Sequence, residues 1–281
     1  MKILAVDDDP IILELLAQIL SVVGTHELTT AANAAEALGT IAQNGAAPFD
    51  CFLLDIHMLG LGGVELTRQI RQMNSYAFTP IIMLTARSEK SYIERAFAAG
   101  ATDYITKPFD LTEFTTRIRI TEELVLSRKA HIAAAKPASA RFKVTQAAEL
   151  LDPSRPFTVQ GIKGVIDYTA MENYVAQLSR SSLFGSTVFA FTLRKSEAYN
   201  DALAAEDFRF LIRDVAQVIA DTLSNQHFLM SHAGNGTYLC ITRSGYHPDM
   251  AQLNERVNIS LNNVQIMTVD GTELYPRVSA G

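Results

Sequence analysis

The chain has 281 residues, 24 of them basic and 30 acidic, with a formal net charge of −6 and a hydrophobic content of 48%. This length predicts about two domains with ordinary hydrophobic cores, and the negative charge argues against a large nucleic-acid surface. No apolar run approaches the length of a membrane span, and acidic residues 7–9 interrupt the first apolar run too early for a signal peptide, so we expect a cytoplasmic protein with no membrane or nucleic-acid partner.

Strands and helices are expected to alternate through the first part of the chain. Apolar runs indicate strands at residues 2–6, 26–31, 49–54, 81–84 and 103–106. Helix-spaced apolar residues lie between and after these runs, with Pro10 at a first helical position and Asn33, Ser88 and Asp110 as N-caps. This alternation predicts a doubly wound α/β domain with a parallel five-stranded sheet, which we assign to residues 1–125.

Polar side chains stand at the carboxyl ends of four of these strands, where open α/β sheets place their chemistry. They are Asp7, Asp8, Asp55, Thr85 and Lys107. In one parallel sheet they converge on a single edge, where carboxylates, a hydroxyl and an ammonium can hold a divalent metal and a phosphoryl group. A single acid at a strand end can also simply cap the next helix, but a cap does not account for the whole set.

The acidic pair, the later aspartate, the hydroxyl residue and the Lys-Pro pair resemble, in this order, the receiver domain of response regulators, whose fold is flavodoxin-like. The resemblance implies that Asp55 accepts a phosphoryl group from a histidine kinase or phosphotransfer protein. It also implies that Mg²⁺ is held by Asp7, Asp8, Asp55 and the backbone carbonyl of His57, while Lys107 neutralises the transferred oxygens.

The same resemblance implies a conformational switch. Thr85 donates its hydroxyl to the phosphoryl oxygens, and its movement opens space for the ring of Tyr104. The alternative for Tyr104 is a half-buried tyrosine packed on an edge strand, and the sequence leaves both open. Leu59 stands where the family has proline, four residues after the acceptor.

Residues 126–156 are expected to form a helical linker. The last helix of the first domain could continue into it, although Thr121 and Arg128 interrupt the apolar seam that a coiled coil needs. Within this stretch, residues 133–140 indicate a linker and residues 141–151 a short helix.

Residues 157–281 indicate a second α/β domain. Strands are expected at residues 157–166, 186–193, 227–231, 237–242, 266–268 and 275–279. Helices are expected at residues 169–178, 202–223 and 250–261. The pair Asn235-Gly236 favours a tight hairpin between two of the strands.

This order resembles the GGDEF domain of diguanylate cyclases, which implies a ferredoxin-like, mainly antiparallel sheet. Residues 169–173 stand where the family has Thr-Gly-Leu-x-Asn, and Asn200-Asp201 where it has Asn-Asp. Residues 233–237 occupy the signature hairpin, and residues 278–281 resemble the final Ser-x-Gly strand.

Departures from the family pattern predict an inactive cyclase. The metal-binding acids of the family fall on Thr192, Asn235 and Gly236, so the metal ions lack carboxylates. The loss of even one transition-state charge contact can cost about 10²-fold in rate, so we expect no enzymatic turnover.

Two functions remain open for the second domain. The first is an inactive GGDEF-like output domain that binds another protein, with homodimer formation left open. The second is a sensor that binds GTP or a cyclic dinucleotide through Asn173, Asn200 and Asp201. The alternative for Asn200-Asp201 is a cap on the helix that follows.

Overall fold

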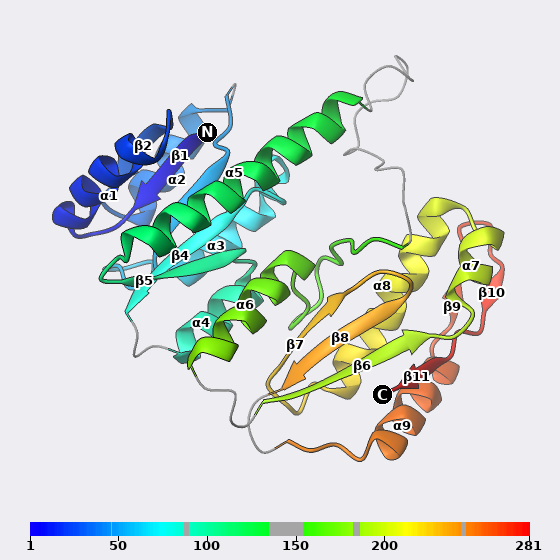
Figure 1. Ribbon diagram of the computed structural model, residues 1–281. Coiled ribbons are helices and arrows are strands. Elements are labelled where there is room, and N and C mark those ends of the chain that lie inside the picture. Colours follow the sequence, from blue (N-terminus) through cyan, green and yellow to red (C-terminus); the bar gives the residue numbers. More distant parts are fainter. Residues whose placement is uncertain (46, 87–89, 135–153, 182–185, 243–245) are drawn as a thin grey trace. The chain divides into compact units, whose positions relative to one another are not determined.

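The structure of the protein is a computed structural model that describes residues 1–281 except 46, 87–89, 135–153, 182–185 and 243–245 (Figure 1). The chain divides into two compact units, Met1–Glu149 and Leu150–Gly281, and each is described by itself. Among the described residues, no helix is both long and apolar enough to cross a membrane.

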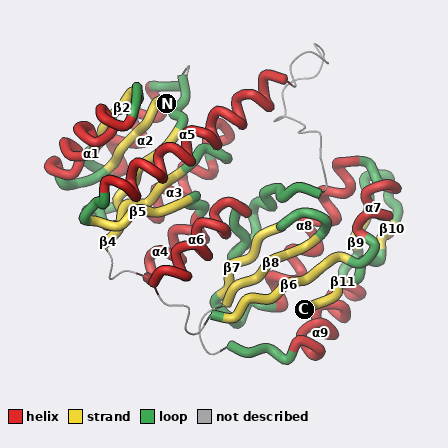
Figure 2. Tube along the Cα trace, in the orientation of Figure 1, coloured by secondary structure: helices red, strands yellow, loops and turns green. Residues whose placement is uncertain are grey.

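The first unit is built on a parallel sheet with the strand order β2-β1-β3-β4-β5. Its strands are β1 (Lys2–Val6), β2 (Glu27–Ala31), β3 (Cys51–Asp55), β4 (Ile81–Ala86) and β5 (Asp103–Lys107). Its helices are α1 (Pro10–Val23), α2 (Ala34–Gln43), α3 (Gly63–Gln72), α4 (Lys90–Ala99) and α5 (Leu111–Ala134), with a 3₁₀ turn at Asn74–Tyr76. Helices and strands alternate along the chain (Figure 2), so the predicted flavodoxin-like fold is confirmed.

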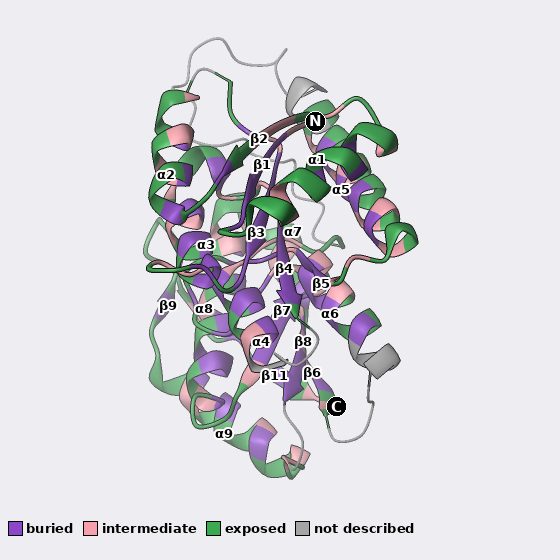
Figure 3. Ribbon diagram, turned by 90° about the vertical axis from the view of Figure 1, so that its left-hand side faces the viewer, coloured by how far each residue is buried: buried purple, intermediate pink, exposed green. Residues whose placement is uncertain are grey.

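Buried apolar residues join α1 and α5 to one face of this sheet. Leu16 of α1 and Phe114 of α5 pack with Ile3, Leu53 and Ile82 from the central strands, and all are fully buried. Figure 3 shows the strands of this sheet as mostly buried. Because both faces of a parallel sheet are covered by helices, only the strand ends remain open for polar chemistry.

The helix starts follow the predicted caps where the structure describes them. Asn33 accepts the backbone N–H of Glu36, and Asp110 accepts that of Glu113. Pro10 is the first residue of α1 as predicted, and the carboxylate of Asp9, which was not among the predicted caps, accepts the N–H of Ile11. The predicted cap Ser88 lies outside the described residues.

Helix α5 continues past residue 125. Near its end, Lys129 forms an ion pair with Asp50, with 2.6 Å between Nζ and Oδ1, and the Arg128 guanidinium donates to the backbone carbonyl of Phe78. Asp50 precedes β3 and Phe78 precedes β4. These contacts therefore join the end of α5 to the amino ends of the strands, opposite the acids at the carboxyl ends. Most of the predicted linker, including the expected helix at residues 141–151, lies outside the described residues.

The second unit contains an antiparallel sheet with the strand order β11-β6-β8-β7 and a separate β9-β10 hairpin. Its strands are β6 (Thr187–Leu193), β7 (Phe228–His232), β8 (Thr237–Thr242), β9 (Ile266–Met267), β10 (Glu273–Leu274) and β11 (Val278–Ala280). Its helices are α6 (Tyr168–Ser181), α7 (Ser196–Ala202), α8 (Ala205–Thr222) and α9 (Met250–Asn263). The predicted second α/β domain with a mainly antiparallel sheet is therefore confirmed.

The core of the second unit lies between the sheet and helices α8 and α9. Phe191 of β6, Tyr238 of β8, Ile212 of α8 and Val257 of α9 are fully buried in it. The hydroxyl of Tyr238 donates to the backbone carbonyl of Ile212 at 2.8 Å, so this polar group is satisfied inside the core.

Three sequence-based predictions for the second unit were wrong. Residues 157–166 form no strand beyond a single bridge from Val165 to Met230, because Gly161 and Gly164 adopt positive φ angles that interrupt an extended chain. The helix predicted at 202–223 is divided into α7 and α8, because Leu203 and Ala204 are extended.

The third correction concerns the closing strands. The strand predicted at 275–279 is shifted to β11, and β10 precedes it as part of a hairpin with β9. Pro276 stands between β10 and β11, and proline lacks the N–H that a ladder needs.

Candidate functional site

Three carboxylates gather where β1 and β3 end. Asp7 and Asp8 follow β1, and Asp55 is the last residue of β3, the strand that pairs with β1. Their nearest oxygen atoms lie within 4.8 Å of one another. Asp7 and Asp55 are buried, whereas Asp8 is exposed, so the cluster opens to solvent on the side of Asp8.

Lys107 brings a positive charge into this cluster from the end of β5. Its Nζ lies 2.7 Å from Oδ2 of Asp7 and 2.6 Å from Oδ1 of Asp55. Burial raises the pKa of Asp55, and the nearby Asp7 adds to this effect against the attraction of Lys107. Burial lowers the pKa of Lys107, but its hydrogen bonds to the two carboxylates outweigh burial and leave that pKa raised.

The donor set fits a hard divalent cation. Three carboxylates face one ammonium, so about two negative charges remain uncompensated, and Mg²⁺ prefers oxygen ligands. Backbone groups hold the acids in place, because the N–H of Leu59 donates to Asp8 Oδ2 and the N–H of Asp9 donates to Asp7 Oδ1, both at 3.1 Å. Asp7, Asp8 and Asp55 are therefore the residues that could hold such an ion.

Thr85 and Tyr104 lie on the neighbouring strands. Thr85, in β4, is buried, and its hydroxyl lies 3.3 Å from the backbone carbonyl of Ala86. Tyr104 is buried in β5 with its ring edge-on to Phe97 of α4, at 6.1 Å between ring centres. Burial raises the pKa of Tyr104 to about 12, so in this conformation the tyrosine packs under α4.

One contact beside the carboxylate cluster was not predicted from the sequence. His57 follows β3, and its exposed ring meets that of Tyr92 from α4 at 4.5 Å between centres. The guanidinium of Arg95, one helical turn further on, lies 5.1 Å from the centre of the Tyr92 ring. Their i, i+3 spacing could have indicated a pair, but nothing in the sequence indicated the partner His57.

The predicted acid positions of the second unit meet around the hairpin. Thr192 of β6 pairs with Thr237 of β8, and their hydroxyl oxygens are 3.4 Å apart. Asn235 and Gly236 both have positive φ angles. A side chain at position 236 would approach the hydroxyl of Ser196 to 2.6 Å, so glycine is required there by space as well as by backbone conformation.

The predicted guanine-binding residues lie on two different helices. Asn173 is in α6, which packs against β7, whereas Asn200 and Asp201 are in the last turn of α7, which packs against α8. The N-cap of α8 is Ala204, with no side-chain bond, so the alternative that Asn200-Asp201 caps the following helix was wrong.

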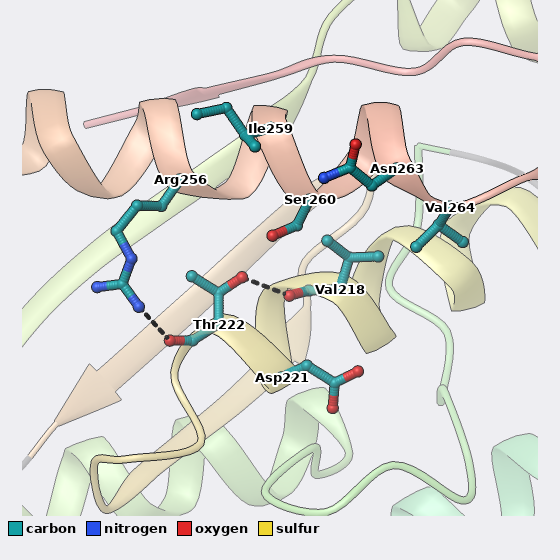
Figure 4. A pocket seen from close by; sticks show the side chains of 8 residues that line it. All are labelled: Val218, Asp221, Thr222, Arg256, Ile259, Ser260, Asn263 and Val264. Atoms are coloured by element: carbon teal, nitrogen blue, oxygen red, sulfur yellow. Dashed lines mark hydrogen bonds between the residues drawn. The ribbon is translucent and has the colours of Figure 1, made fainter.

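A groove of about 560 Å³ lies between α8 and α9 (Figure 4). At one end of the groove, the Arg256 guanidinium donates to the backbone carbonyl of Thr222 at 3.3 Å. The Thr222 hydroxyl donates to the backbone carbonyl of Val218. None of the predicted site residues lines this groove, so the strand-end cluster of the first unit remains the candidate site.

The comparison with protein families matches residues of the first unit. A family model for the response regulator receiver domain matches residues 3–119. The transcriptional regulatory proteins YvrH and ResD of Bacillus subtilis are 39% and 42% identical over 118 residues, which is 42% of this chain and 47% and 46% of theirs. The chain thus spans about half the length of the curated relatives that it matches.

A solved structure is similar over a comparable share of the chain. The Vibrio cholerae chemotaxis protein CheY4 is 32% identical, with a TM-score of 0.39, over 43% of this chain and 97% of that structure. The family match covers all five strands of the sheet except Lys2, the first residue of β1, and it includes the acids, the lysine and the threonine at the strand ends. Residues 3–119 are therefore a response regulator receiver domain.

Proposed function

We propose that this chain is a response regulator of a phosphorelay that accepts a phosphoryl group on Asp55. The observation that carries the proposal is the position of Lys107, whose ammonium bonds to both Asp7 and Asp55 inside a cluster of three carboxylates. One cation placed against two buried acids suits a site in which negative charge must be neutralised at a fixed point.

The receiver residues have separate roles in the proposed transfer. An oxygen of the ionised Asp55 carboxylate forms a bond to phosphorus while the bond from phosphorus to the donor histidine nitrogen breaks. Lys107 neutralises charge on the transferred oxygens, and the Thr85 hydroxyl donates to one of them. Mg²⁺, held by Asp7, Asp8, Asp55 and the backbone carbonyl of His57, would supply further charge neutralisation.

The second unit is proposed as an inactive GGDEF-like output domain that binds a protein. Its hairpin between β7 and β8 and its antiparallel sheet support the resemblance. Neutral residues at Thr192, Asn235 and Gly236 support the loss of turnover. The names of the bacterial relatives describe transcriptional regulation, but the match to them covers 118 residues, about half of their length. The net charge of −6 favours a protein target over DNA.

A nucleotide sensor is the second candidate for this unit. It is favoured by the exposed hydroxyl of Thr192 beside that of Thr237, at positions where a phosphate could accept hydrogen bonds without metal. In this case the unit would bind GTP or a cyclic dinucleotide without converting it.

The test of phosphoryl transfer is labelling with acetyl phosphate and Mg²⁺, read by intact mass. One base-labile phosphoryl group is expected on the wild type and none on Asp55→Asn, because an amide is not a nucleophile toward phosphorus. Asp9→Asn is the matched control, because Asp9 neighbours the cluster and asparagine keeps its cap. Labelling that persists in Asp55→Asn would refute the acceptor assignment.

The output is tested by affinity capture with the full chain. Beryllofluoride and Mg²⁺ mimic the phosphoryl group at Asp55, and a protein partner should be retained differently with and without them. Retention of DNA instead would overturn the proposed target class, and the same retention in Asp55→Asn would show that the receiver does not control the output.

A further inference from the structure

One face of the second sheet is left open at β6. Along this strand Phe189, Phe191 and Leu193 point into the core, so Val188, Ala190 and Thr192 lie on the opposite face. That side is solvent-exposed at Val188, with 56% of its surface accessible, and at Thr192. The residues of the open face are therefore accessible to a ligand.

Three hydroxyl groups form a row across this face. Thr192 stands between Thr237 of β8 and Ser279 of β11 in the register of the sheet. Residues directly opposite one another in an antiparallel sheet share a face, with their Cβ atoms about 5 Å apart. The measured separation of 3.4 Å between the Thr192 and Thr237 hydroxyl oxygens agrees with this arrangement.

Two arginines lie beside the row. The N–H of Arg194 donates to the carbonyl of Arg277 at 2.7 Å, which continues the pairing of β6 with β11 by one residue. Both arginines are exposed, and Nε of Arg194 donates to the hydroxyl of Ser279 at 2.8 Å. The guanidinium of Arg194 is therefore held over the row of hydroxyls.

The arrangement of the arginines leaves positive charge uncompensated. Among the described residues, neither Arg194 nor Arg277 has an ion-pair partner, and Lys195 follows Arg194 directly. Like charges on opposite strands destabilise a sheet. An anion between the two arginines would remove that repulsion.

We propose that this open face binds a phosphate group, through Arg194 and Arg277 and the hydroxyls of Thr192, Thr237 and Ser279. Guanidinium groups bind phosphate through paired, charge-assisted hydrogen bonds. Hydroxyls donate to the remaining oxygens, so no metal ion is needed. The inference deepens the nucleotide-sensor candidate and rests on it, because Thr192 and Thr237 belong to both; the arginines are the addition that the register and contacts of this sheet supply.

The neighbouring apolar surface favours a nucleotide as the source of the phosphate. Ala190 and Val188 continue the open face along β6, and the half-buried Leu239 stands opposite Ala190 on β8. A planar base can cover this strip while its phosphates reach the arginines. Free phosphate would use only the polar end of the face.

The test measures binding of fluorescent ATP and GTP analogues to the full chain, with inorganic phosphate as competitor. EDTA is present, because the receiver site needs a divalent cation to hold an anion. The double change Arg194→Gln and Arg277→Gln should weaken binding by about 10- to 100-fold, since it removes two charged donors. Thr192→Val should weaken it by about 2- to 10-fold.

Arg213→Gln is the matched control, because it removes one exposed positive charge from α8, away from this face. Unchanged affinity in this control supports the proposal. Unchanged affinity in the double arginine variant would overturn it, as would the absence of wild-type binding at millimolar nucleotide. If inorganic phosphate displaces the fluorescent analogues as well as unlabelled nucleotide does, the phosphate site is supported and the contact with the base is overturned.

A stability readout separates this site from a structural role. Without an anion, Arg277→Gln should melt as high as wild type or up to about 3 °C higher, because repulsion between the arginines is relieved. With saturating nucleotide the wild type should melt higher than the variant. A variant that melts lower in both conditions would assign Arg277 to structure and overturn the proposal.

Discussion

The two sheets carry opposite charges at corresponding places. Where the central strands of the first sheet end, three carboxylates surround the ammonium of Lys107. Where β6 of the second sheet ends, hydroxyls of Thr192 and Thr237 stand beside Arg194, and no carboxylate occupies the positions predicted for metal acids. The first arrangement attracts a cation, and the second attracts an anion.

The difference separates two kinds of phosphate chemistry. Asp55 is both a nucleophile and a metal ligand in the proposed transfer, so a phosphoryl group can become covalently attached there. A hydroxyl of Thr192 can donate to phosphate but cannot hold the metal that polyphosphate transfer requires. We therefore propose that the receiver takes up and releases a phosphoryl group, whereas the second unit only recognises one.

The largest expected effect concerns cyclic dinucleotide synthesis, which we expect to be absent. The full phosphorylated chain, incubated with GTP and Mg²⁺ or Mn²⁺, should give no cyclic di-GMP by mass spectrometry, because Thr192, Asn235 and Gly236 offer no carboxylate to the metal. An active diguanylate cyclase under the same conditions is the positive control. Product that disappears in Asn235→Ala would restore an enzyme and remove the contrast between the two units.

The next effect lies in the receiver. Asp8→Ala should weaken Mg²⁺ binding and slow phosphorylation by acetyl phosphate by about 10²-fold, since a carboxylate ligand is lost. Without metal, the same change relieves repulsion from Asp7 and Asp55, so the variant should unfold no more easily than wild type. Asp9→Asn is the control. Equal Mg²⁺ affinity in wild type and Asp8→Ala would show that the ligands are misassigned.

How far the sequence predicted each unit depends on how local its signals are. The parallel sheet followed from apolar runs that end in chemically distinct residues, such as Asp55 and Lys107, and its strand order could be inferred from a family resemblance. In the second unit, the break at Leu203 and the turns at Gly161 and Gly164 depend on tertiary packing. An amphipathic pattern runs through such a break unchanged, so periodicity alone could not place it.

The candidate sites of the two units also differ in how far the sequence predicts them. Strand-end acids are predictable because a parallel sheet brings all its carboxyl ends to one edge. The pairing of Arg194 with Arg277 joins residues 83 positions apart through strand register, and the sequence contains no signal for that register. The contact of His57 with Tyr92 was missed for the same reason, because it joins a loop to a helix.

A buried histidine differs from both sites, because burial favours the neutral form of its side chain. His232 of β7 is buried between Phe157 and Tyr238, and its Nε2 has no hydrogen-bond partner among the described residues. Burial lowers the pKa of His232 from 6.5 to about 4. Between these values the unfolded chain binds a proton that the folded unit does not, so the free energy of unfolding falls as the pH is lowered.

The expected loss is up to about 3 kcal/mol between pH 6.5 and 4. His232→Phe should flatten this dependence in calorimetric melts of the full chain, because phenylalanine keeps an aromatic ring and cannot be protonated. His227→Gln, an exposed site, is the control. A steep acid loss that persists in His232→Phe would assign the pH dependence to other groups.

The smallest expected effect concerns the edges of the sheets. β11 is an edge strand of three residues, and the side-chain amide of Asn258 in α9 pairs with Val278 as a neighbouring strand would. Its Nδ2 donates to the Val278 carbonyl and its Oδ1 accepts the Val278 N–H, both at 3.0 Å. The edge strands of the first sheet, β2 and β5, are each five residues long and pair in parallel with their neighbours. We therefore expect them to depend less on side-chain hydrogen bonds of this kind.

Asn258→Ala should therefore lower the free energy of unfolding of the second unit by about 1–2 kcal/mol, because two backbone groups of Val278 lose their partners. Asn262→Ala is the matched control, an exposed asparagine on the same helix that should change stability by about 0.5 kcal/mol or less. Chemical denaturation of the full chain, with hydrogen exchange at Val278 as the local readout, measures both. Equal exchange at Val278 in the two variants would show that β11 is held by β6 alone, and that both sheets keep their edges without side-chain help.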